Sequence, residues 1–137
     1  MLYNYNARVL RVVDGDTIDV MIDLGLHIQV KERCRFLGVN TPETFGRKAD
    51  SDEYRAGKVA QAQVIRWLCS GITDRESIDL ATNGKGDMVG EIVGTVRIRT
   101  HKDKKGKYGR YLIELFVGDD TESINTKLIH MGFGAEY

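Results

Sequence analysis

The feature that most limits the fold is an alternation of apolar and polar residues near the start of the chain. It runs over residues 5–13, stops at the tripeptide DGD (residues 14–16) and resumes in "TIDVMIDL", residues 17–24. Such alternation is typical of strands with one buried face, and an Asp-Gly turn between two runs predicts a tight hairpin. A third strand-like segment covers residues 27–39. The first part of the chain is therefore expected to form three consecutive strands.

Two later segments have a helical pattern. Asp50 followed by Glu53 resembles a capping box, and Gly71 is a typical stop, so the sequence predicts a long helix between them. Its expected apolar face consists of Ala56, Ala60, Val64, Trp67 and Leu68. A second, short helix is expected over residues 123–131.

Further strand-like runs cover residues 76–82, 91–100 and 110–117. Three consecutive strands, a helix and more strands within 137 residues fit an α+β fold, a small antiparallel β-barrel with helices packed on it. The five-stranded OB-fold is the expected member of this class. No repeat or linker divides the sequence, so a single domain over residues 1–137 is expected. A fold of this class often binds nucleic acid, but the fold alone decides no function.

Composition excludes several classes of protein. The 20 basic and 20 acidic residues cancel, which argues against a nonspecific nucleic-acid coat that depends on overall charge. No apolar run approaches the ~18 residues of a membrane-spanning helix, and the N-terminus lacks the pattern of a secretory signal, so a cytoplasmic location is expected. Cys34 and Cys69 have no metal-ligand spacing and are expected to be small buried residues.

Two predicted loops gather oxygen-bearing side chains. Asp14 and Asp16 flank the glycine of the hairpin turn, and "VNTPE" places Asn40, Thr41 and Glu43 on a loop after the third strand. Hydrolysis of a phosphodiester needs a cation, donors shaped to the phosphate oxygens and a base that aims a water molecule. A few oxygens from these loops would leave room for substrate and water around calcium.

Two arginines complete the candidate site. The planar guanidinium group suits bidentate contact with phosphate, and Arg35 and Arg110 are the candidates. Arg33, on the same face of the strand as Arg35, is left unassigned. Each motif alone has a simpler interpretation: "DGDT" as a hairpin turn, "NTPE" as a loop that enters a helix, and "KYGR" as a solvated turn.

In combination and order, however, "VVDGDTIDV", "RFLGVNTPE" and "KYGRYL" resemble the signatures of the staphylococcal nuclease (thermonuclease) family. "INTKLIHMGFG" resembles the short second helix of that family, and the resemblance covers most of residues 7–135. It implies an OB-fold barrel that cleaves DNA and RNA phosphodiesters with one calcium ion.

The resemblance also implies roles for individual residues. Asp16 matches the metal-binding aspartate with Asp14 close beside it, and Thr41 matches the residue that gives the metal its backbone carbonyl. Arg35 and Arg110 match the two arginines that hold the scissile phosphate, and Glu43 matches the carboxylate that activates or orients the attacking water. Lys107 and Tyr108 match contacts to a terminal phosphate of the nucleotide.

The chain departs from the family pattern at three places. Asn40 stands where the best-known member has a second metal-binding aspartate, although its amide oxygen can still serve as a ligand. Tyr137 is a partial replacement for the base-stacking tyrosines of that member. Residues 72–92 read as an insertion that forms an extra hairpin.

We therefore expect a calcium-dependent endonuclease that acts on DNA, with RNA left open as a substrate, and that leaves 3′-phosphate ends. A nucleic-acid-binding module on the same barrel with little turnover is the main alternative, and a structural or assembly domain is a third. A monomer without membrane contact is expected.

Overall fold

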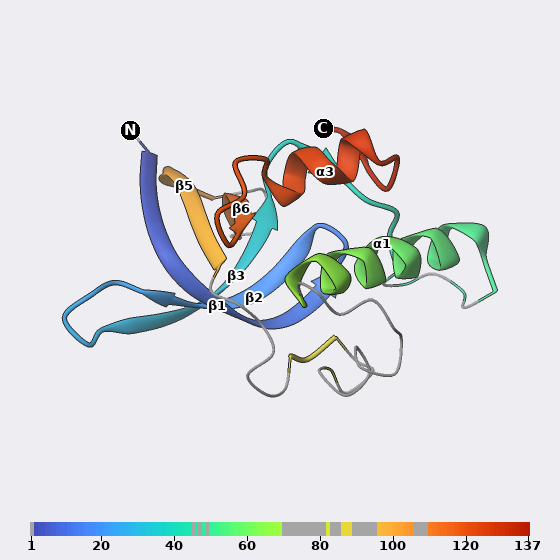
Figure 1. Cartoon of the computed structure of the whole chain (residues 1–137). Coiled ribbons are helices and arrows are strands. Elements are labelled where there is room, and N and C mark those ends of the chain that lie inside the picture. The colour runs from blue at the N-terminus through green and yellow to red at the C-terminus, as the bar shows by residue number, and fades with distance from the viewer. Residues whose placement is uncertain are drawn as a thin grey trace.

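The computed structural model describes residues 2–44, 46, 48, 50–69, 82, 86–88, 96–105 and 110–137, apart from the side chains of residues 2 and 102–105. Figure 1 shows a β-barrel with helices packed beside it. In chain order the elements are β1 (Leu2–Asp14), β2 (Thr17–Asp23), β3 (Gln29–Phe36), β4 (Val39–Asn40), α1 (Asp52–Leu68), β5 (Val96–Lys105), β6 (Tyr111–Val117), α3 (Ile124–His130) and β7 (Ala135–Glu136).

The barrel is closed in the order β1-β2-β3-β6-β5, with β5 paired to β1, while β4 and β7 form a separate two-stranded sheet. The expected five-stranded barrel with helices is thus confirmed. Four of its pairings are antiparallel and the β3–β6 pairing is parallel. An odd number of strands cannot close with antiparallel pairs alone, because the direction must alternate around the ring. The mixed ring is consistent with an OB-fold.

The core is built from alternate residues of the barrel strands and from one face of each helix. Its largest fully buried side chains include Phe36, Ile18, Leu68, Ile98, Ile113, Leu115, Ile124 and Leu128. Cys34 and Cys69 are buried free thiols within this core, as expected from the sequence. Burial of this continuous apolar surface is the main source of stability for the barrel and for the packing of the helices on it.

The long helix differs from its prediction at the first turn. Ser51, not Asp50, is the N-cap, because its side chain accepts a hydrogen bond from the backbone N–H of Tyr54. Ala60, Val64 and Leu68 are buried as expected, whereas Trp67 is half-buried and Ala56 is exposed. The C-cap is Cys69, and Gly71 lies outside the described residues. The short helix begins after Ser123 and ends before Met131, as expected.

The third predicted strand is divided by a turn. β3 ends at Phe36, and the chain turns through Leu37 and Gly38 before β4 begins. Gly38 has a φ of 79°, a conformation that favours glycine. Asn125 of α3 holds this turn by donating a hydrogen bond to the carbonyl of Leu37 at 2.8 Å. The turn places the polar loop after β4 beside the β1–β2 hairpin.

The predicted extra hairpin at residues 72–92 lies mostly outside the described residues. Of the described part, residues 86–88 lie along β1: Val12 donates to the carbonyl of Gly86 and Met88 donates to that of Leu10, both at 2.8 Å. An isolated antiparallel bridge joins Thr82 and Met88. In the described parts of the chain, no helix is long and apolar enough to span a membrane.

Candidate active site

The turn between β1 and β2 is fixed against two other elements by Gly15. A Cβ atom at Gly15 would lie 2.7 Å from Cβ of Ala60 and 2.9 Å from Oγ1 of Thr41. These distances are shorter than van der Waals contact, so the close approach requires glycine at this position. The turn is thereby packed against α1 and against the loop that follows β4.

Asp16 is the most enclosed acid of the site, with 6% of its surface exposed. Its carboxylate accepts hydrogen bonds from the hydroxyl of Thr17 at 3.0 Å and from the backbone N–H of Thr41 at 3.1 Å. Its backbone carbonyl accepts from the N–H of Phe36 at 2.8 Å. Asp16 therefore joins the hairpin turn, the end of β3 and the polar loop, which is consistent with a position at the centre of a site.

Asp14 lies beside Asp16 and accepts a hydrogen bond from the hydroxyl of Thr44 at 2.6 Å. Burial raises the pKa of Asp14 above its ordinary value, and the neighbouring charge of Asp16 acts in the same direction. The hydrogen bond from Thr44 and the cations Lys58 and Arg110 oppose this rise in the pKa. Two carboxyl groups thus share one turn, as the DGD motif predicts.

Arg35 contacts three residues assigned to the site from the sequence. Its Nη2 donates to Oδ1 of Asn40 at 2.9 Å and lies 3.6 Å from Oδ2 of Asp16. Its guanidinium carbon lies 4.7 Å from the ring centre of Tyr137. The strand β7 positions this ring, because it pairs with β4 and the N–H of Tyr137 donates to the carbonyl of Gly38 at 3.1 Å. The structure thus brings the last residue of the chain to Arg35.

Arg110 approaches from the other end of the same carboxylate. Its Nη1 lies 3.5 Å from the hydroxyl oxygen of Thr17, which donates to Oδ1 of Asp16. Arg35 lies beside Oδ2, the second oxygen of that carboxylate. Two half-buried guanidinium groups therefore flank Asp16, each held within reach of the hairpin turn.

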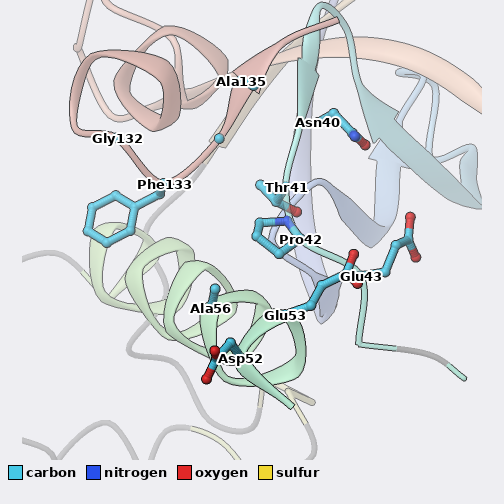
Figure 2. Close-up of a pocket in the computed structure, with 11 residues that line it drawn as sticks. Asn40, Thr41, Pro42, Glu43, Asp52, Glu53, Ala56, Gly132, Phe133 and Ala135 are labelled. Carbon is cyan, nitrogen blue, oxygen red and sulfur yellow. The ribbon is translucent and has the colours of Figure 1, made fainter. Parts of the chain in front are cut away.

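The loop after β4 carries Thr41, which is buried, and Glu43, which is exposed. Glu43 lines an open pocket of about 610 Å³ that lies between this loop, the first turns of α1 and the segment before β7. Figure 2 shows Glu43 on the loop and Glu53 on the facing helix, with Phe133 on the third side. An exposed carboxylate at an open pocket can reach a solvent molecule or a bound substrate.

The donors available for a metal ion are few in the described part of the chain. No group of three or more His, Cys, Asp or Glu side chains among the described residues could hold a metal ion. Asp14 and Asp16 supply the carboxylates, and Asn40 supplies an amide oxygen that already accepts from Arg35. All these donors are oxygens, which suits a hard cation such as calcium. The hydroxyl of Thr41 is buried and has no hydrogen-bond partner among the described residues.

The structure thus brings together most residues of the sequence-based site: Asp14, Asp16, Arg35, Asn40, Thr41, Arg110 and Tyr137. Lys107 and Tyr108 lie outside the described residues, so their contacts with a nucleotide stay predictions. Sequence reasoning missed Thr17 and Thr44, which hydrogen-bond the two aspartates. Both stand directly beside residues that were assigned, in "DGDT" and "NTPET", and this adjacency was the available signal.

Comparison with known proteins gives relatives of two kinds. The chain is 33% identical to the thermonuclease of Staphylococcus intermedius over 124 residues and 32% identical to that of Staphylococcus hyicus over 125 residues. These alignments cover 90% and 91% of this chain and 55% of each relative. It is also 29% identical over 142 residues to an uncharacterized protein of Methanocaldococcus jannaschii, with 98% of this chain and 60% of the relative covered.

The chain thus spans little more than half the length of the curated relatives that it matches. No family model matches it. At this distance the comparisons establish a thermonuclease-like relationship for most of the chain.

Proposed function

We propose that this protein is a nuclease that hydrolyses phosphodiester bonds of DNA, and that Arg35 and Arg110 bind the scissile phosphate. The observation that carries the proposal is the placement of these two guanidinium groups on opposite oxygens of one buried carboxylate, Asp16. Planar guanidinium groups match phosphate oxygens and stabilise the charge that develops on them in the transition state. The similarity to two thermonucleases supports the same reaction.

The proposed reaction is attack of water on phosphorus with departure of the 5′-oxygen. The P–O5′ bond breaks, the 5′-oxygen takes up a proton, and the phosphate stays on the 3′-oxygen. Glu43 is the proposed base that accepts a proton from the water or orients it, and its exposure at an open pocket supports this assignment.

Calcium is the proposed cofactor, with Asp16, Asn40 and Thr41 as ligands and Asp14 beside them. The support is chemical, since every side-chain donor near the turn is an oxygen. When bound, calcium would neutralise negative charge on the phosphate. The amide oxygen of Asn40 would have to exchange its hydrogen bond with Arg35 for the metal ion.

Lys107 and Tyr108 are proposed contacts to a terminal phosphate, and Tyr137 is proposed to contact a base or sugar next to the scissile bond. The position of the exposed Tyr137 ring on Arg35 supports the second assignment. Aromatic rings beside a phosphate-binding site commonly stack on bases.

A second candidate function is nucleic-acid binding with little turnover. The observation that favours it is the engagement of Asn40, a neutral residue, with Arg35, which leaves the described residues without a cluster of three acids. Binding of phosphate to arginine needs no metal ion, whereas the proposed hydrolysis does.

One experiment separates the two functions. Purified protein is incubated with a labelled DNA oligonucleotide in calcium, in magnesium or in chelator, and both binding and cleavage are measured. Cleavage that requires metal, with 3′-phosphate products, supports the nuclease. Binding without cleavage in every condition would instead support the binding module.

A further inference from the structure

The hairpin formed by β2 and β3 extends beyond the barrel in Figure 1, and we call residues 21–31 the arm. Its two strands stay paired from the candidate site, where Thr17 lies opposite Arg35, out to Asp23 opposite Gln29. The tip of the arm, residues 24–28, therefore lies at the far end of the same two strands that carry the phosphate-binding residues.

The tip is apolar and exposed. Leu26 is 91% exposed, Ile28 is 53% exposed and Leu24 is 46% exposed. Single exposed apolar residues are common on protein surfaces, but three within five residues at the end of a projecting hairpin are not. Such a cluster is typical of a contact surface for another molecule.

The tip is also held in a conformation that leucine and histidine rarely adopt. Leu26 has a φ of 54° and His27 a φ of 63°, both in the left-handed region. Hydrogen bonds fix this shape: Leu24 donates to the carbonyl of Ile28, and Ile28 donates to that of Gly25, both at 2.9 Å. Neither Leu26 nor His27 is buried, so core packing does not repay the strain. Strain of this kind is commonly retained at functional sites.

A row of cations connects the tip to the candidate site. Lys31, Arg33 and Arg35 lie on one face of β3, because residues two apart in a strand point to the same side. The acid on the neighbouring strand is already engaged, since Asp19 accepts from Nε of Arg33 at 2.7 Å. The row ends at the proposed phosphate clamp and not at the tip. This continuity favours an extended anionic polymer over a lipid surface as the binding partner.

We propose that the arm is a second contact surface for nucleic acid, in which Leu26 inserts against a base step while Lys31 and Arg33 face phosphates between that step and the clamp. Apolar side chains inserted in this way partly unstack the bases of a duplex. The proposal rests on the proposed function for the position of the scissile phosphate. Six residues separate Arg35 from Gln29, which corresponds to about 20 Å of strand and to about six base pairs of duplex.

The test is a binding series with duplex DNA of increasing length, measured by fluorescence anisotropy in chelator so that metal-dependent cleavage cannot occur. The variant is Leu26→Gly, because glycine accepts the left-handed backbone and the variant should keep its thermal stability. Val59→Ala is the matched control, since Val59 is 55% exposed on α1, outside the arm. If Leu26→Gly does not fold, Leu26→Asn replaces it, because asparagine also tolerates this conformation.

We expect wild-type protein and the Val59→Ala control to bind long duplexes about tenfold more tightly than Leu26→Gly, since burial of a leucine side chain can supply at least this factor. All three proteins should bind duplexes too short to reach the tip equally well. In a long duplex that contains 2-aminopurine, the fluorescence should rise with wild type and not with Leu26→Gly. Lys31→Ala should lower the slope of log affinity against log salt by about one.

Equal binding of wild type and Leu26→Gly at every length would overturn the proposal. It would also be overturned if Leu26→Gly lost affinity for phosphatidylserine vesicles and kept its affinity for DNA. Failure of the proposed function is distinguishable from failure of the arm. A protein that shows the length dependence and never cuts contradicts only the nuclease, and one that cuts without the length dependence contradicts only the arm.

Discussion

The guanidinium group of Arg35 donates a hydrogen bond to the side-chain oxygen of Asn40 at 2.9 Å. The same nitrogen lies 3.6 Å from the carboxylate of Asp16. A proposed phosphate ligand is therefore bound to two proposed metal ligands, one neutral and one charged. Because the acceptor at position 40 carries no charge, it holds Arg35 less strongly than a carboxylate would, and it also attracts a divalent cation less strongly.

The first prediction follows from that missing charge. We expect Asn40→Asp to tighten calcium binding by about tenfold or more, because a carboxylate replaces a neutral oxygen at the proposed ligand position. Turnover at saturating calcium should rise little, since tighter binding of the ground state need not favour the transition state. Calorimetric titration of both proteins with calcium measures the effect. Equal affinities would mean that position 40 does not face the metal ion.

The second prediction concerns the two arginines. We expect Arg35→Lys and Arg110→Lys each to lower turnover by about a thousandfold, because lysine keeps the charge but loses the planar fork that matches the transition state. Binding of uncleaved oligonucleotide should weaken far less. Arg55→Lys is a suitable control, since Arg55 is exposed on α1 and pairs only weakly with Asp52 at 3.4 Å. A clamp role is excluded for either arginine whose lysine variant keeps near-normal turnover.

The third prediction concerns the proposed base. Glu43→Gln should fold normally, because the side chain is exposed, and should lose roughly a hundredfold to ten-thousandfold in rate. Glu53→Gln provides a matched control from the facing side of the same pocket. Single-turnover cleavage of a labelled oligonucleotide gives both rates. Unchanged activity of the Glu43 variant would require another base or none.

Much of the fold could be predicted because local patterns and tertiary structure agree in it. The hairpin around Gly15 and the helix that follows Ser123 are examples, since periodicity and turn chemistry both indicate them. The N-cap of α1 was placed one residue early because Asp50 and Ser51 are both good caps and only the backbone geometry selects Ser51. The break in the third strand was missed because the apolar run continues through Gly38, and its left-handed conformation was not considered.

The membership of the candidate site was easier to predict than its contacts. Arg35, Asn40 and Asp16 come from motifs that the sequence presents openly, but the hydrogen bond between Arg35 and Asn40 depends on the turn between β3 and β4. The position of Tyr137 on Arg35 likewise depends on the pairing of β7 with β4. These contacts join segments whose relative placement no local pattern specifies.

The fourth prediction concerns the two thiols. Burial raises the pKa of Cys34 to about 12 and also raises that of Cys69. At neutral pH, far below these values, both groups are protonated, and the thiol is a much weaker nucleophile than the thiolate. We expect no rapid reaction of the native protein with a disulfide reagent, and reaction of both cysteines in concentrated guanidinium chloride. Rapid labelling of the folded protein would contradict the burial of these side chains.

A buried asparagine joins α3 to the barrel and to the turn that precedes the site. The side-chain oxygen of Asn125 accepts from the N–H of Leu115 at 3.1 Å. Its amide nitrogen donates to the carbonyls of Leu37 at 2.8 Å and Ile113 at 2.9 Å. One side chain thus pairs three backbone groups, two on β6 and one on the turn between β3 and β4.

The fifth prediction is that Asn125→Ala lowers the free energy of unfolding by about 3 kcal/mol or more, because each buried backbone group left unpaired costs roughly 1–3 kcal/mol. Asn125→Asp should be destabilising too, since its carboxylate keeps the bond from Leu115 but would face two carbonyl oxygens. Asn6→Ala on the exposed face of β1 is the matched control and should change the free energy of unfolding by about 0.5 kcal/mol or less. Urea unfolding at equilibrium measures all three. A loss below about 1 kcal/mol in Asn125→Ala would mean that water replaces the amide, because only a solvated cavity could leave three such groups satisfied.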